Sequence, residues 1–150
     1  MEIKRISAHQ TYSVRHPVLR PGRPIEDCSF EFDDHPLSIH FCIELDGKVI
    51  SVLSALPIQY SSFPELNAMR IRGIATLDSF QRLGYGSRLM ICAEQELKNK
   101  RVDLLWLNAR INASEFYSNL GYKPEGDLFN IDGIGIHQQF LKFLIGEKTV

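Results

Sequence analysis

The segment from Gln81 to Arg88 carries the residues best suited to binding a ligand. It follows a stretch typical of a strand and opens an amphipathic helix. Gly84 and Gly86 let the backbone turn sharply and approach a ligand closely. The start of a helix offers unpaired N–H groups and a partial positive charge, which together favour a phosphate or pyrophosphate. Arg82 and Arg88 add positive charge to this segment.

Two common nucleotide-binding motifs are absent from this segment. The P-loop pattern GxxxxGK[ST] does not occur, and the dinucleotide pattern GxGxxG needs a glycine where Leu89 stands. Taken alone, the segment also fits a second interpretation, which is a glycine-rich turn that binds nothing.

The elements that must position this segment form a mixed α/β pattern. Ser7 can cap a first helix with Gln10 as its reciprocal partner, and Pro17 should end or kink that helix. In the first half of the chain, periodicity and turn residues predict a strand at residues 2–6, a helix after Ser7, an irregular segment at 17–36, and a hairpin of strands 39–45 and 48–56 that turns at Asp46-Gly47. A strand at 67–76, a helix at 86–97 and a strand at 102–107 follow. The chain then has a short helix that Asn112 starts and Gly121 ends, and a final strand at 136–144. Hairpins come first and strand–helix–strand units follow, which predicts a mixed sheet with helices on both faces.

Composition narrows the class of protein. A chain of 150 residues is about one domain, so we expect a single domain over residues 1–150. Its 44% apolar and 23% charged residues are typical of a globular protein. A net charge of −1 and the lack of a basic stripe argue against a nucleic-acid partner. No run of about 18 apolar residues and no signal-peptide pattern occurs, which argues against a membrane partner.

The cysteines and histidines indicate neither disulfides nor a metal. Three cysteines stand at wide spacing without a CxxC pair, so we expect a reducing, cytoplasmic location. Four histidines, His9, His16, His35 and His40, show no ligand spacing, and we expect no metal site.

Two motifs in register give the chain a family resemblance. Gln81, Gly84 and Gly86 fill the defined positions of [RQ]-x-x-G-x-[GA], the acetyl-CoA motif of the GNAT acetyltransferases. A later segment is similar to the family's A-x-x-x-Y-x-x-x-G-[FY] pattern, which is matched by Ala113, Tyr117, Gly121 and Tyr122. The chain resembles this family over roughly residues 38–143, and more loosely an uncharacterised bacterial subgroup of it.

The resemblance implies a fold, an acyl donor and residue roles. The fold would be a GNAT-like, mostly antiparallel central sheet with a splayed central parallel pair and helices on both faces. The donor would be acetyl-CoA, with its pantetheine arm on the amides of Ile74 to Thr76, its pyrophosphate on those of Arg82 to Ser87, and Asn108 near the arm. Tyr117 would be the general acid toward the leaving thiolate. The implied cofactor-binding residues are Ile74, Ala75, Thr76, Gln81, Arg82, Leu83, Gly84, Tyr85, Gly86, Ser87, Asn108 and Asn112.

The chain departs from the family pattern at the general base. Attack on a thioester needs a neutral amine, a donor to the oxyanion and a proton for the thiolate. Many members place a glutamate on the third strand, where this chain has Arg70 and Arg72. We therefore expect the base to be a relayed water or a residue elsewhere in the chain, such as Glu44 or His137. The two arginines could hold an acceptor carboxylate or phosphate, or form a solvated strand face.

Further alternatives stay open at this point. The family's asparagine three residues before Ala113 is Arg110 here, so Asn108 or Asn112 could replace its contact. Asn108 could equally cap a turn, Tyr117 could be a half-buried core residue, and Trp106 should be core.

We expect the acceptor to be an amine of a small molecule, a peptide or a protein, and its groove to be built from residues 17–36, 57–66 and 124–135. The alternatives to an N-acetyltransferase are a non-catalytic acyl-CoA-binding domain and an adaptor domain. A homodimer could form through the final strand, whose apolar residues are Phe140, Leu141, Phe143 and Leu144.

Overall fold

The computed structural model describes residues 1–145. The chain forms two units, one made of Met1–Pro57 and Ile71–Leu97, the other of Ile58–Arg70 and Lys98–Val150. Within the described part of the chain, no helix is both long and apolar enough to cross a membrane.

Within residues 1–145, seven strands form a mixed sheet in the order β1-β2-β3-β4-β5-β7-β6. Their bounds are β1 Glu2–Ile6, β2 Ile39–Leu45, β3 Lys48–Leu56, β4 Ala68–Thr76, β5 Leu104–Arg110, β6 Lys123–Ile131 and β7 Gly135–Phe143. Strands β4 and β5 pair in parallel, from Ala68 with Leu104 to Arg70 with Trp106. The pairs β1–β2, β2–β3, β5–β7 and β6–β7 are antiparallel. The predicted mixed sheet with a central parallel pair is therefore confirmed.

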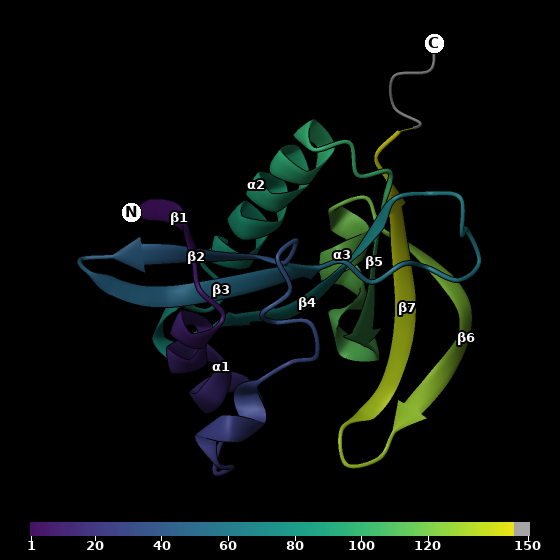
Figure 1. Cartoon of the computed structure of the whole chain (residues 1–150). Helices are drawn as coiled ribbons and strands as arrows, with labels where there is room; N and C mark the ends of the chain where they lie inside the picture. Colours follow the sequence, from purple (N-terminus) through teal and green to yellow (C-terminus); the bar gives the residue numbers. More distant parts are fainter. Residues whose placement is uncertain (146–150) are drawn as a thin grey trace. The chain divides into compact units, whose positions relative to one another are not determined.

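Two helices cover the sheet of the first unit. Helix α1, Tyr12–Leu19, packs Val14 into a core cluster with Cys42, Val52 and Ala75. Helix α2, Tyr85–Asn99, buries the predicted apolar face, which comprises Leu89, Met90, Ala93 and Leu97. The two helices lie on opposite sides of β2 and β3 (Figure 1). Burying each apolar face against the strands is what stabilises this arrangement.

The β2–β3 hairpin forms as predicted. Asp46 and Gly47 both take positive φ angles, 51° and 79°. A two-residue turn with this geometry matches the twist of the strands that it joins, and Asp-Gly is a preferred sequence for it.

The segment from Ser7 through α1 bears on two expectations. The Ser7 amide donates to the Gln10 side chain at 2.8 Å and the Gln10 amide donates to the Ser7 hydroxyl at 3.2 Å, which are the predicted reciprocal bonds. They enclose the start of a 3-10 turn, His9–Thr11, which leads into α1; the cap residue of α1 itself is Thr11, which makes no side-chain cap bond. Of the two effects expected of Pro17, an end of the helix is contradicted, because α1 continues to Leu19. Val18 and Leu19 pack against the same core cluster as Val14, and this burial offsets the bond that Pro17 cannot make.

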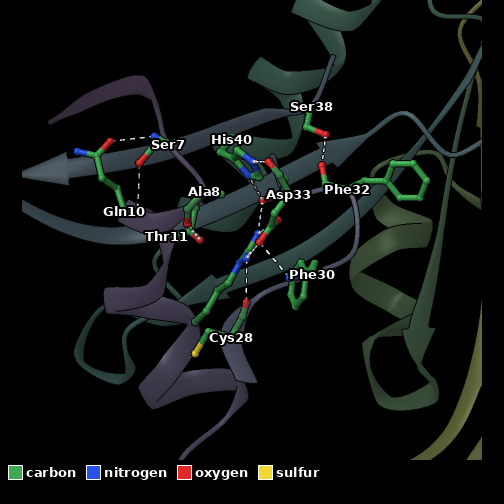
Figure 2. A network of polar contacts seen from close by, with 12 residues as sticks. Ser7, Ala8, Gln10, Thr11, Cys28, Phe30, Phe32, Asp33, Ser38 and His40 are labelled. Atoms are coloured by element: carbon green, nitrogen blue, oxygen red, sulfur yellow. Dashed lines mark hydrogen bonds and ion pairs between the residues drawn. The ribbon is translucent and has the colours of Figure 1, made fainter. Parts of the chain in front are cut away.

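A buried ion pair anchors the irregular segment that follows α1 (Figure 2). The guanidinium of Arg15, on α1, is 0% exposed and binds both carboxylate oxygens of Asp33, at 2.7 and 3.0 Å. It also donates to the Cys28 carbonyl at 2.9 Å and to the Ser54 hydroxyl at 2.8 Å. His40 bonds the Ser54 hydroxyl at 2.6 Å and the Asp33 carbonyl at 2.9 Å. The segment thus depends on buried polar contacts with α1, β2 and β3.

The second unit contains a strand that periodicity did not predict. Strand β6 forms a long hairpin with β7 (Figure 1). Its residues are almost all exposed and its register shifts between Glu125 and Phe129. An exposed, irregular edge strand lacks the alternation of apolar residues on which sequence analysis depends.

The pairing of β7 limits the expected route to a dimer. β7 is paired with β5 on one side and with β6 on the other. Most backbone groups of β7 from Gly135 to Leu141 are therefore already used, and this part does not offer a free edge to a second subunit. The homodimer stays a prediction.

The core of the second unit is aromatic and confirms Trp106 as a core residue. Trp106 is 8% exposed and clusters with Tyr60, Ala68, Leu104 and Leu141. Its indole N–H donates to the Ile58 carbonyl at 2.8 Å, so the polar atom of the ring is satisfied.

Candidate active site

The glycine segment of the first unit forms a left-handed loop before α2. Arg82 and Gly84 have φ angles of 65° and 87°. Alternation of left-handed residues with helical ones aligns successive backbone N–H groups into an anion-binding concavity. A Cβ atom built at Gly84 would meet nothing within 4 Å, so the space beside this residue is open. The loop therefore has room for a ligand at its glycine.

The amides of this loop are not used within the described chain. The first bond of α2 runs from the Arg88 amide to the Gly84 carbonyl at 3.1 Å. Among residues 1–145, no backbone carbonyl accepts from the amides of Arg82 through Ser87. These N–H groups, together with the partial positive charge of the helix start, can bind an anion.

The side chains of the segment have mixed roles. The Gln81 amide group donates to the Thr76 carbonyl at 2.9 Å and to Asp78 at 3.2 Å, so it braces the turn after β4. Arg88 contacts the sulfur of Met1 at 2.9 Å. Leu83 is 62% exposed and Tyr85 lies against Phe80. The contribution of this segment to ligand binding is therefore mainly through its backbone.

The end of β4 is held to β3 in the same unit. The Ser51 hydroxyl bonds the Ala75 carbonyl at 3.3 Å and the Thr76 hydroxyl at 2.7 Å. Just before Ile74, Gly73 has φ 69°, and a Cβ there would come within 2.6 Å of the Phe30 ring. Only glycine therefore fits where β4 bends under Phe30.

Tyr117 lies on helix α3, Ser114–Asn119, in the second unit. Its ring contacts Phe116, Tyr122 and Phe140, with centroids 4.9, 6.0 and 5.9 Å away. Gly121 ends the helix as predicted, with φ 92°. Part of the residue is exposed, but its phenol is closely surrounded by protein, and this burial raises the pKa of Tyr117 to about 12.

The hydroxyl of Tyr117 has no hydrogen-bond partner among residues 1–145. The phenol is therefore protonated at neutral pH and free to donate to a group from outside the protein. A general acid must carry its proton and be able to donate it, and the Tyr117 hydroxyl meets both requirements, as a weak acid.

The burial of Tyr117 predicts a loss of stability in alkali. A pKa raised from 10 to about 12 means that the folded state holds this proton more tightly than the unfolded state. The stabilisation is complete below pH 10 and is lost as the pH rises toward 12, by about 2 kcal/mol. Denaturant titrations at pH 9 and pH 11.5 should show this loss in the wild type and a smaller one in Tyr117→Phe. An equal loss in both proteins would contradict it.

The two predicted asparagines lie in different settings of the second unit. Asn108, on β5, accepts a bond from Gln139 at 3.1 Å. Asn112 is exposed in a 3-10 turn, Ile111–Ala113. The prediction that Asn112 caps the short helix was wrong, because the cap position is Ala113 and no side chain bonds there. The turn preceding α3 shifts the helix start past Asn112.

The strand alternation of β5 also separates Asn108 from Tyr117. Leu107 pairs with Phe140, whose ring contacts Tyr117, whereas Asn108 pairs with Gln139. Successive side chains of a strand point to opposite faces. Asn108 therefore lies on the face of β5 opposite to the one that packs toward Tyr117.

Glu44 and His137, the two side chains considered as the general base, both have partners within the chain. Glu44 forms an ion pair with Lys4 at 3.0 Å. His137 is 6% exposed, lies against Phe129 and bonds the Gly135 carbonyl through Nδ1 at 2.8 Å. A carbonyl only accepts, so Nδ1 carries the hydrogen.

Arg70 and Arg72 do not form the solvated strand face that was one of the two expectations. Both are half-buried. The Arg70 guanidinium lies over the Trp106 ring, 5.1 Å from its centroid, and that of Arg72 lies 4.1 Å from the Phe30 centroid. Both arginines are therefore stacked on aromatic rings.

Comparison with known proteins identifies the family. The model of the acetyltransferase (GNAT) family matches residues 6–122. The uncharacterized N-acetyltransferase YitI of Bacillus subtilis strain 168 is 38% identical over 144 residues, covering 96% of this chain and 97% of that protein. The chain belongs to the acetyltransferase (GNAT) family.

Solved structures share the GNAT fold. A putative N-acetyltransferase from Lactobacillus plantarum aligns with a TM-score of 0.78 at 20% identity, over 97% of this chain and 100% of that one. An aminoglycoside 6′-N-acetyltransferase crystallised with coenzyme A aligns with a TM-score of 0.75 at 16% identity, over 97% and 98% of the two chains. At these identities the likeness concerns the fold.

As a GNAT member, the protein is an acyl-CoA-dependent N-acyltransferase, and its acyl donor is acetyl-CoA. The glycine loop fits this donor, because it combines unused amides, a left-handed backbone and open space at Gly84. When bound, acetyl-CoA supplies an activated acetyl thioester.

Sequence reasoning missed several residues that shape these regions. It did not foresee the Arg15–Asp33 pair, Phe30 over Gly73, or the bond between the Tyr60 hydroxyl and Gln139 at 2.5 Å. Each of these contacts joins segments that are far apart in the chain, so it cannot be predicted from local spacing. The glycine inside the predicted strand at 67–76 was the one available signal, since such a glycine often marks a close approach.

Proposed function

We propose that the protein acetylates a primary amine of a small molecule or peptide by direct attack, with Tyr117 as general acid. The amine nitrogen forms a bond to the acetyl carbon and loses a proton to a base. The carbon–sulfur bond breaks, and the thiolate takes its proton from the Tyr117 hydroxyl, which solvent then reprotonates. The observation that carries this role is a protonated phenol whose hydroxyl has no partner among the described residues.

The proposal assigns donor binding chiefly to backbone groups. The amides of Arg82 to Ser87 hold the pyrophosphate and those of Ile74 to Thr76 hold the pantetheine arm. The unused N–H groups of the loop support the first assignment, and the fixed end of β4 supports the second. In this scheme Gln81 orients the loop through its bonds to Thr76 and Asp78. The three free cysteines are compatible with a cytoplasmic location, which we also propose.

Donor binding is tested by Gly84→Glu. A carboxylate at this position should repel the pyrophosphate and fill the open space beside the loop. Acetyl-CoA at 100 times its dissociation constant should stabilise the wild type by about 2.7 kcal/mol, or roughly 5–10 °C in Tm. We expect this shift to vanish in Gly84→Glu.

Gly47→Glu is the matched control for this experiment. Gly47 also has a positive φ, 79°, and open space at its Cβ position, but it lies in the β2–β3 turn. This variant carries the same charge and a similar backbone penalty, and should keep the full acetyl-CoA shift. A folded wild type without any shift, or a shift retained in Gly84→Glu, would contradict the loop assignment.

An acceptor screen separates catalysis from binding alone. A domain that binds acyl-CoA without turnover would show the acetyl-CoA shift but transfer no acetyl group to any amine above the uncatalysed rate. Transfer that depends on Tyr117 would establish the enzyme mechanism proposed here.

A further inference from the structure

One face of the second unit gathers aromatic and amide side chains around Arg70. Arg70 pairs with Trp106 across β4 and β5, and Asn108 pairs with Gln139 across β5 and β7. Trp106 and Asn108 stand two residues apart, so they point to the same face. The Arg70 guanidinium over the Trp106 ring confirms that Arg70 shares this face.

The neutral polar groups of this face satisfy one another. The Tyr60 hydroxyl bonds Gln139 Oε1 at 2.5 Å, and Gln139 Nε2 donates to Asn108 Oδ1 at 3.1 Å. The Tyr60 ring lies 5.4 Å from that of Trp106, and the indole N–H is bonded to Ile58. These side chains are held in place by their contacts and form a fixed polar and aromatic wall.

Unlike the other polar side chains of this face, Arg70 is not fully hydrogen-bonded. Its Nε atom is buried and has no hydrogen-bond partner among the described residues. No carboxylate within residues 1–145 forms an ion pair with it. Burial lowers the pKa of Arg70, yet an arginine stays charged in proteins. A half-buried guanidinium without a counter-ion is destabilising, and an anion from outside the protein would neutralise its charge.

We propose that Arg70 binds a carboxylate of the acceptor, so that the substrate is an amine that also carries a carboxylate, such as an amino acid or a peptide end. One guanidinium fork matches one planar carboxylate through two parallel bonds. The Trp106 ring, on which the guanidinium stacks, supports Arg70 from the protein side, and the Tyr60 ring packs against Trp106. Tyr60 also belongs to the 57–66 segment in which we expected part of the acceptor groove.

Binding can be tested without turnover, because Trp106 is the single tryptophan of the sequence. Its emission should respond to a ligand at Arg70. The probes are N-acetylated amino acids, which are product-like carboxylates, together with their C-terminal amides and inorganic phosphate. We expect at least one acid to give a saturable change in the wild type and its amide to give none. In Arg70→Gln the acid should bind at least about tenfold more weakly.

Two variants control this experiment. Arg70→Lys keeps the charge without the fork and should bind the acid with intermediate strength. Arg101→Gln removes the same charge from an exposed position and should bind like the wild type. All variants should keep the acetyl-CoA stabilisation, which shows that they are folded. Equal responses to acid and amide, a response to phosphate alone, no response to any acid, or unchanged binding in Arg70→Gln would overturn the proposal.

The kinetic form of the test rests on the proposed function. With amino acids and amino acid amides as acceptors, the wild type should prefer the acid of a pair, and Arg70→Gln should lose this preference through a raised KM. Transfer without any preference would refute the Arg70 assignment and leave the acetyltransferase intact. Carboxylate binding without transfer to any amine would refute the proposed catalysis and leave Arg70 as an anion site.

Discussion

Asp33→Ala is expected to lower the free energy of unfolding by about 3–5 kcal/mol. The substitution leaves the 0% exposed Arg15 guanidinium without its counter-charge. It also removes the acceptor for the Phe30 amide, which bonds Asp33 Oδ2 at 2.9 Å. Domains of this size are stable by only about 5–15 kcal/mol, so the loss should be visible as a large fall in the urea midpoint.

The exposed pair of Arg23 and Asp27 provides the matched control. These side chains contact at 2.8 Å with four-residue helical spacing, and Arg23 is 62% exposed. Asp27→Ala should therefore change the stability by less than about 1 kcal/mol. Replacing both partners of the buried pair, with Arg15→Met and Asp33→Leu together, should cost less than Asp33→Ala alone, because no charge is left unpaired. Similar small effects of Asp33→Ala and Asp27→Ala would show that the buried pair is not an anchor.

Tyr117→Phe is expected to reduce kcat by about 10²–10⁴-fold, the usual contribution of a positioned general acid. The ring and its contacts with Tyr122 and Phe140 are kept, so the fold should not change. KM for acetyl-CoA should stay near its wild-type value, because the loop amides are untouched. Steady-state rates with an amine found in the acceptor screen would measure both quantities.

The pH profile adds a second measurement for Tyr117. Its pKa of about 12 keeps the acid protonated across the working range, so wild-type kcat should not fall on the alkaline side from loss of this proton below about pH 11. Tyr12→Phe removes a hydroxyl from α1 and should leave kcat unchanged. A loss of less than about threefold in Tyr117→Phe would assign Tyr117 to the core instead.

Much of the local structure could be predicted because its causes lie within a few residues. Asp46-Gly47 and the alternating residues around it are sufficient for the β2–β3 hairpin, and the reciprocal Ser7–Gln10 bonds depend on residues three apart. The helical face of α2 follows from its spacing alone. The two motifs around Gly84 and Tyr117 were sufficient for the family, which the comparisons confirm. The individual roles of the site residues remain predictions.

The sequence by itself therefore determined the order of most elements, the glycine loop and the family. Only the tertiary structure decided that α1 passes Pro17, that β6 forms on the edge of the second unit, and that Arg15 is buried against Asp33. It also stacked Arg70 on Trp106, where the pattern allowed a solvated strand face. These features depend on partners far away in the chain, whose burial and charge outweigh local propensity. Local spacing carries no information about such partners, so these contacts can be recognised only in the folded structure.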